Sequence, residues 1–230
     1  MKKYSWVFLC LFLYLICIGA GVATRNSYTD IWTEVPTQPQ DRVKYVFHED
    51  KDAYFTASLQ SILDQAAIIV SATANSEGKN SGKTFLTEMT VNKTYKNDGG
   101  FTGNTLIVCE PIRLDKITSQ KDGKPLYTME MLQGRGHRAR TKIVPGKNYI
   151  LLLKEFLPKG YHTEIPTYTM IESPYAKLSP DSAITAEQYE KPVWPIDYEQ
   201  SKQYEILLQN KNQIKIFFDT KKKILSLLSN

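Results

Sequence analysis

The stretch FLTEMTVNKTYK, residues 85–96, decides how this chain folds. Four of its six odd-numbered positions are apolar, against one of the six even-numbered positions. The odd ones are Phe85, Met89, Val91 and Tyr95, and the even one is Leu86. An alternation with period two is typical of a strand that buries one face. The sequence therefore predicts a long β-strand here.

The residues just before this strand read EGKNSGKTF, 77–85, and resemble a phosphate-binding loop. Such a loop requires four residues between its first glycine and Gly-Lys-Thr, whereas Gly78 and Gly82 enclose three. Glu77 stands where the first glycine belongs, and its negative charge would face phosphate. The loop must also open a helix, and a strand is expected instead. We therefore expect no nucleotide site, and we interpret Asn75 to Thr84 as the hairpin between two strands.

Working outward from this hairpin, the hydrophobic periodicity predicts a mainly β domain. A helix is expected at 58–65, with Ser58 as its N-cap, and strands are expected at 67–70, 104–110, 149–153 and 167–171. Asn97 to Gly100 should form a turn. The polar stretch from 112 to 140 is given no strand. An amphipathic helix is expected at 212–228, with lysines opposite its apolar stripe.

The N-terminus carries an export signal. Lys2 and Lys3 precede the apolar run from Tyr4 to Ala23, which directs the following chain out of the cytoplasm. Gly21 and Ala23 suit a signal peptidase, yet a helix of about twenty residues also spans a bilayer. Residues 1–23 are thus a signal peptide or a membrane anchor. We divide the rest into a spacer at 24–53 with a short strand at Val43 to Phe47, a barrel domain at 54–180, and a linker with a C-terminal helix at 181–230.

Charge and cysteine content exclude several classes of protein. The formal net charge is +5, with Lys2 and Lys3 contributing two, and this is too mild for nucleic-acid binding. Cys10 and Cys17 lie in the apolar run and Cys109 is alone, so the exported domain has no disulfide. We interpret Cys109 as a core residue.

No motif supports catalysis, a metal or a cofactor. The three histidines, His48, His137 and His162, have no spacing typical of metal ligands. The segment GRGHRA, 134–139, fits a dinucleotide pattern, but no clear strand precedes it and no helix follows. A hydrolase would require His137 or His162 to meet a carboxylate and a nucleophile.

The order of elements resembles the OB-like barrels of exported Gram-positive proteins, related in outline to the netrin/tissue-inhibitor-of-metalloproteinase module. The residues that carry the resemblance are SLQSILDQAAIIVSATA (58–74), VNKTYKND (91–98), GNTLIVCE (103–110) and PGKNYILLLKE (145–155). The resemblance covers about half the chain and implies a five-stranded barrel. Inhibitors of this fold use an N-terminal cysteine, which the exported chain lacks, so inhibition is not implied.

OB folds bind ligands through a sheet face and through two of their loops. The resemblance places these loops at Asn75 to Thr84 and Leu157 to Pro166. We therefore expect a non-enzymatic binding module at the cell surface. Its ligand would be an anionic wall polymer, an oligosaccharide or a protein, bound by Lys79, Lys83, Lys159 and His162, with Arg135, His137, Arg138 and Arg140 as a rim. The alternative is a protein-interaction role, in which the basic C-terminal helix docks to a partner or to an anionic membrane.

Overall fold

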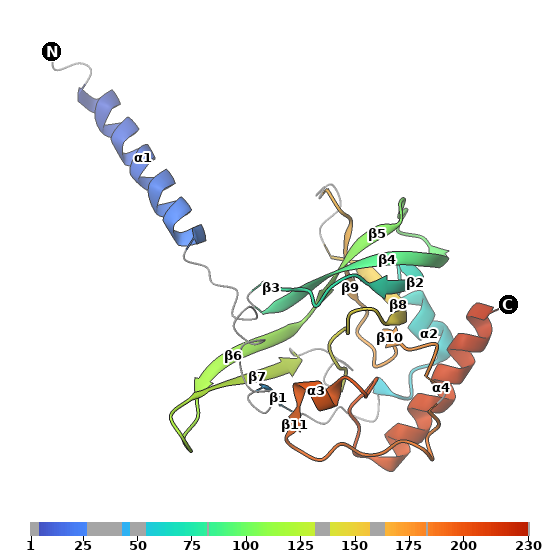
Figure 1. Cartoon of the computed structure of the whole chain (residues 1–230). Helices are drawn as coiled ribbons and strands as arrows, with labels where there is room; N and C mark the ends of the chain where they lie inside the picture. Colours follow the sequence, from blue (N-terminus) through green and yellow to red (C-terminus); the bar gives the residue numbers. More distant parts are fainter. Residues whose placement is uncertain are drawn as a thin grey trace.

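A closed five-stranded β-barrel forms the centre of the protein (Figure 1). The computed structural model describes residues 5–26, 43–46, 54–81, 83–131, 139–156, 164–182 and 184–229. The barrel strands are β2 (Ile68–Ala74), β4 (Thr84–Asn97), β5 (Thr105–Glu110), β8 (Asn148–Glu155) and β9 (Thr167–Met170). Strand β2 pairs with β4 and β8, and β9 closes the ring by pairing antiparallel with β8 and parallel with β5.

The strands predicted from periodicity are confirmed. In β4 the side chains of Phe85, Thr87 and Met89 are fully buried, while their neighbours are partly or fully exposed. The second half of β4 is more exposed. The predicted alternation of buried and exposed side chains is therefore observed only before Val91. In β8 every residue from Tyr149 to Leu153 is buried, as expected for a central strand.

A short helix, α2 (Leu59–Asp64), precedes the barrel as predicted. The Ser58 hydroxyl oxygen accepts a hydrogen bond from the Ser61 backbone N–H at 3.2 Å, which satisfies one of the free donors of the first turn. Ile62 is fully buried and fixes the helix on the barrel core.

A second, four-stranded sheet lies beside the barrel, in the order β11, β1, β7, β6. These strands are β1 (Val43–Tyr45), β6 (Ile112–Thr118), β7 (Pro125–Met131) and β11 (Ile196–Asp197). The reading of 112–140 as a polar stretch without strands was wrong over 112–131. Polar side chains alternate with buried ones there, as at Leu114, Tyr127 and Met129, and β6 and β7 form a hairpin that reaches away from the barrel (Figure 1).

Two further strands extend the barrel sheet. Strand β3 (Lys79–Ser81) pairs with the start of β4, and β10 (Lys177–Leu178) pairs with β8. The expected hairpin between the first two barrel strands thus contains a short strand of its own.

The residues after 180 share the core of the barrel. Helix α3 (Tyr198–Ser201) follows β11, and α4 (Lys211–Ser229) matches the predicted C-terminal helix closely. Ile214, Phe217 and Ile224 on α4 belong to the same hydrophobic cluster as the barrel strands. A smaller cluster includes Tyr45, Tyr127 and Tyr198 and fills the space under the second sheet.

The N-terminal segment is helical from Ser5 to Asn26 (α1), and its described apolar side chains are exposed. In the part of the chain that the structure describes, no helix has both the length and the apolar character needed to span a membrane. Strand β1 confirms a short strand in the expected spacer, as far as the described residues extend.

Candidate functional site

The loop between β2 and β4 is fixed at its base by polar side chains. Asn75 donates to a Glu88 carboxylate oxygen at 3.0 Å and accepts from the Thr90 hydroxyl at 2.8 Å. The backbone turns at Gly78, whose φ of 73° is a conformation that favours glycine. Strand β4 continues directly from this loop, so the expectation that no helix follows it is confirmed.

Lys79 and Lys83, both predicted ligand contacts, are exposed on this loop. Between them Asn80 points inward, is buried, and donates to the Thr84 carbonyl oxygen at 3.4 Å. This alternation follows from the pairing of β3 with β4, which directs successive side chains to opposite faces. The structure thus places two ammonium groups in solvent on a hydrogen-bonded support.

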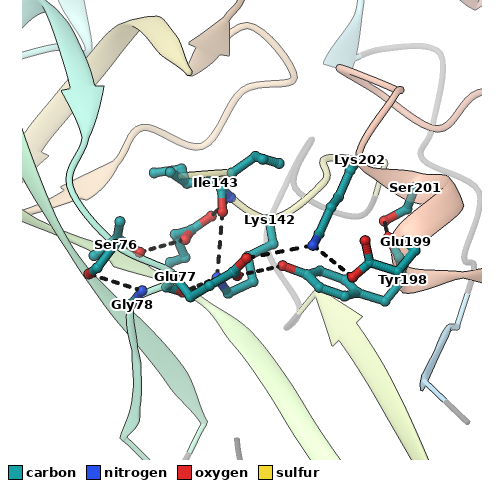
Figure 2. A network of polar contacts seen from close by, with 12 residues as sticks. Ser76, Glu77, Gly78, Lys142, Ile143, Tyr198, Glu199, Ser201 and Lys202 are labelled. Atoms are coloured by element: carbon teal, nitrogen blue, oxygen red, sulfur yellow. Dashed lines mark hydrogen bonds and ion pairs between the residues drawn. The ribbon is translucent and has the colours of Figure 1, made fainter. Parts of the chain in front are cut away.

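Glu77, in the same loop, turns inward and joins three partners (Figure 2). Its Oε2 atom accepts from the Tyr198 hydroxyl at 2.7 Å and from Lys142 Nζ at 3.2 Å, and its Oε1 atom lies 3.6 Å from Lys202 Nζ. Burial raises the pKa of Glu77, but the charge of Lys142, the hydrogen bond from Tyr198 and the charge of Lys202 together lower it below 4.5. The carboxylate therefore stays ionised.

In the ion pair between Glu77 and Lys142, the Lys142 side chain is fully buried. Its ammonium group also donates to the Glu77 carbonyl oxygen and lies 4.9 Å from the centre of the Phe85 ring. The Lys142 backbone N–H donates to the Tyr45 hydroxyl at 2.8 Å. Lys142 therefore connects the β2–β4 loop to β1 in the second sheet.

A second buried carboxylate, Glu110, lies at the end of β5. Its two oxygens accept from the Ile143 backbone N–H at 2.8 Å and from the Thr87 hydroxyl at 3.1 Å. Both bonds satisfy a charged group that is fully removed from water, as buried charges require. Glu110 thereby holds the segment around Ile143 against the barrel.

Lys177 and the pair of Glu205 and Lys221 continue the buried polar groups toward α4. Lys177 Nζ donates to the Thr141 carbonyl and hydroxyl oxygens and to the Lys142 carbonyl oxygen. Glu205 accepts from Lys221 Nζ at 2.5 Å and from the Ser179 backbone N–H at 2.6 Å. Burial raises the pKa of Glu205, and the charge of Lys221 opposes this rise.

Three adjoining hollows lie where the C-terminal segment crosses the barrel. The central one has a volume of about 170 Å³ and contains Tyr189, Tyr204 and Phe218 in its wall. A hollow of about 430 Å³ leads from it toward the start of β8, and one of about 420 Å³ leads along α4. All three share Ser182. We call them together the C-terminal groove.

The predicted rim of basic residues falls in two places. Arg140 is buried, with 1% of its surface exposed, and its Nη1 atom lies 3.3 Å from the Met170 sulfur. It packs beside β9 and forms a β-bridge with Ile206, so a ligand at the surface does not reach it. The other rim and loop candidates, Arg135, His137, Arg138, Lys159 and His162, lie outside the described residues.

Cys109 is a buried core residue, and burial raises the pKa of its thiol to about 11. Among the residues that the structure describes, no group of three histidine, cysteine or acidic side chains is arranged to hold a metal ion.

Sequence reasoning missed the buried charges and the C-terminal groove. Glu110, Lys142 and Lys177 each stand next to short apolar runs, IVCE, KIV and AKL, and a charge in such a place is a signal of a buried pair. The groove had a weaker signal, since Tyr189 and Tyr204 lie in a stretch interpreted as a linker. No family model matches the chain, and no curated protein matches it either.

Proposed function

We propose that this protein is an exported or membrane-tethered binding module of the Gram-positive cell surface, with an OB-like barrel and no catalytic role. Residues 4–23 export the chain and are then either removed or kept as an anchor. The five-stranded closed ring, in which β5 runs parallel to β9, supports an OB-like type. Helix α2 before the barrel matches the element order on which the resemblance rests. The ligand of the β2–β4 loop is an anionic polymer of the cell envelope.

The observation that carries this proposal is the fixed presentation of Lys79 and Lys83. Both lysines lie on the β2–β4 loop. Glu77 holds this loop in place, because its carboxylate accepts hydrogen bonds from Lys142 and Tyr198. A loop that is already ordered loses little conformational entropy when a ligand binds. Two exposed ammonium groups on such a loop suit repeated phosphate or carboxylate groups.

The test is a double variant, Lys79→Gln with Lys83→Gln, titrated with purified glycerol-phosphate wall polymer. Exposed ion pairs contribute about 0.2–1 kcal/mol each, so binding should weaken by about two- to thirtyfold. Binding by the unmodified protein should also weaken as salt increases. A matched control is Lys121→Gln with Lys124→Gln, which removes the same charge from the exposed tip of the β6–β7 hairpin. Equal affinity of the loop variant and the control contradicts the proposal.

A second candidate function is docking through α4 to a protein partner or an anionic membrane. Its support is a row of exposed lysines, Lys211, Lys215, Lys222 and Lys223, opposite the buried stripe. Deleting the helix does not test this function, because Phe217 and Ile224 belong to the barrel core. Replacing Lys215, Lys222 and Lys223 with glutamine keeps the buried stripe intact. If α4 is the docking surface, this variant loses binding to vesicles of anionic lipid or to the partner, and the Lys79 and Lys83 variant does not.

A further inference from the structure

The central hollow of the C-terminal groove places aromatic rings beside the carboxamides of Gln188 and Gln203. Tyr189 lies 5.9 Å from Tyr204 and 5.7 Å from Phe218 between ring centres, and the planes are inclined at 69° and 54°. The three rings therefore form inclined walls of the central hollow. All three are only partly buried, so apolar surface remains available to a ligand.

The ring walls are held in place before any ligand arrives. The Tyr189 hydroxyl donates to the Ile206 carbonyl oxygen at 2.7 Å and accepts from the Leu208 N–H at 2.8 Å. The backbone carbonyl of Tyr204 accepts from the Thr141 hydroxyl at 3.0 Å. A site whose walls are fixed in this way requires little ordering on binding.

The wall of the central hollow contains two acidic residues, Glu205 and Glu190, of which Glu190 is exposed to solvent. Glu205 is paired with Lys221 at 2.5 Å, and Lys221 Nζ lies 6.0 Å from the Phe218 ring centre. A cationic ligand beside the rings would meet this resident ammonium group, and an anionic ligand would meet the Glu205 carboxylate. The two carboxylates oppose an anion and Lys221 opposes a cation beside Phe218, so a neutral ligand is favoured next to the rings.

Polar side chains at the edge of the hollow offer both donors and acceptors. Gln188 and Gln203 are exposed there, and Ser182 is half-buried. A carboxamide donates through nitrogen and accepts through oxygen, which matches a ligand hydroxyl that does both. The flanking hollows each have volumes within the usual range for small-molecule sites, about 300–1,000 Å³.

From these features we infer that the C-terminal groove binds a neutral sugar chain. A pyranose ring has an apolar C–H face, which packs on an aromatic wall, and a rim of hydroxyls, which pair with carboxamides. The central hollow takes one sugar ring, packed against the exposed surfaces of Tyr189, Tyr204 and Phe218. Neighbouring units extend toward β8 and along α4. This site is formed by other segments than the β2–β4 loop and extends the proposed function to a second ligand.

The test is isothermal titration calorimetry of the exported chain with soluble oligosaccharides of N-acetylglucosamine and of glucose. We expect saturable binding of at least one series by the unmodified protein. Tyr204→Ala and Gln203→Ala should each weaken it by about tenfold, as expected when a packing face or a hydrogen bond to the ligand is lost. Gln203 is exposed, so its replacement tests the site even if Tyr204→Ala fails to fold.

Two controls separate this site from the loop. Tyr95→Ala removes a partly exposed ring on β4, outside the groove, and should leave sugar binding unchanged. The Lys79→Gln, Lys83→Gln variant should also keep sugar binding while it loses the anionic polymer. The inference is overturned if neither oligosaccharide series binds at millimolar concentration. It is equally overturned if both groove variants bind as tightly as the unmodified protein.

Discussion

Lys177 shows what a single buried lysine does to this protein. Burial lowers the pKa of its ammonium group from 10.5 to about 7, and the charge of Glu110 partly opposes the change. The unfolded chain then holds a proton at this side chain over a pH range in which the folded protein releases it. Stability must rise with pH across that range, because the unfolded state binds more protons.

We predict that the free energy of unfolding rises between about pH 7.5 and 9.5, by up to about 1.4 kcal/mol per pH unit for one proton. Below pH 7 both states are protonated and the penalty is complete. Toward pH 10 the buried tyrosines oppose the rise, since burial raises the pKa of groups such as Tyr149 above 10. Urea titrations at several pH values measure this slope.

The Lys177→Met variant should lose this slope, whereas Lys93→Met, at an exposed lysine, should keep it. An unchanged slope in Lys177→Met would contradict the assignment.

Two glycines with positive φ differ in how much space surrounds them. Gly78 and Gly100 have φ values of 73° and 66°. A Cβ atom at Gly100 meets nothing within 4 Å, whereas one at Gly78 overlaps the hydroxyl of Thr87 and lies 3.2 Å from the Leu86 carbonyl oxygen. Thr87 cannot rotate away freely, because its hydroxyl donates to buried Glu110.

We predict that Gly100→Ala lowers the free energy of unfolding by about 1–2 kcal/mol, the cost of a left-handed conformation. Gly78→Ala should lower it by about 1–3 kcal/mol more, because the added methyl group also overpacks the site. Denaturant titration of both variants measures the difference. Equal losses would show that the turn at Gly78 can open without disturbing Thr87.

Among the elements, α4 was predicted well and the β6–β7 hairpin was missed. The apolar residues over 212–228 recur at helical spacing for several turns. A pattern of that length is typical of an amphipathic helix and is seldom mistaken for a strand. The hairpin has short alternating runs separated by the charged turn Lys121 to Lys124. The hairpin is covered by a sheet that includes β1 and β11, which lie more than sixty residues away in sequence on either side. The sequence of the hairpin by itself therefore looks polar.

We predict that Phe217→Ala lowers the free energy of unfolding by about 3–5 kcal/mol. Phe217 is fully buried and stacks on Tyr175 with ring centres 5.5 Å apart. Leu227→Ala is the matched control on the same helix, because 52% of Leu227 is exposed and its truncation removes little packing. Thermal and urea unfolding of both variants check this. Equal stability of the two would mean that α4 does not stabilise the barrel.

For the molecule as a whole, the two hydrophobic clusters are connected by a shared strand, β4, and by hydrogen bonds between buried polar groups. Strand β4 contributes Phe85 to the smaller cluster and Met89 to the larger one. Lys142 bonds across the same boundary, because its backbone N–H donates to the Tyr45 hydroxyl in the smaller cluster. Neither sheet can therefore separate without breaking a β4 contact or exposing a buried charge.

We expect the protein to unfold in a single transition, with equal calorimetric and van't Hoff enthalpies. Differential scanning calorimetry provides both values. Two resolved transitions would show that the second sheet is an independent unit.

The sequence alone determined the β class, the barrel strands, the capped helix before them and the amphipathic helix at the end. Each of these is a local pattern of apolar residues, which a strand or helix of fixed period converts into one buried face. It also predicted that a strand rather than a helix follows the Gly-rich loop, since the alternation after Thr84 is a local pattern. Only the tertiary structure decided that Glu77 turns inward, that Arg140 is buried, and that Tyr189, Tyr204 and Phe218 meet in one groove. These placements depend on contacts between segments far apart in the chain, and burial of a charge depends on which partner the fold brings to it.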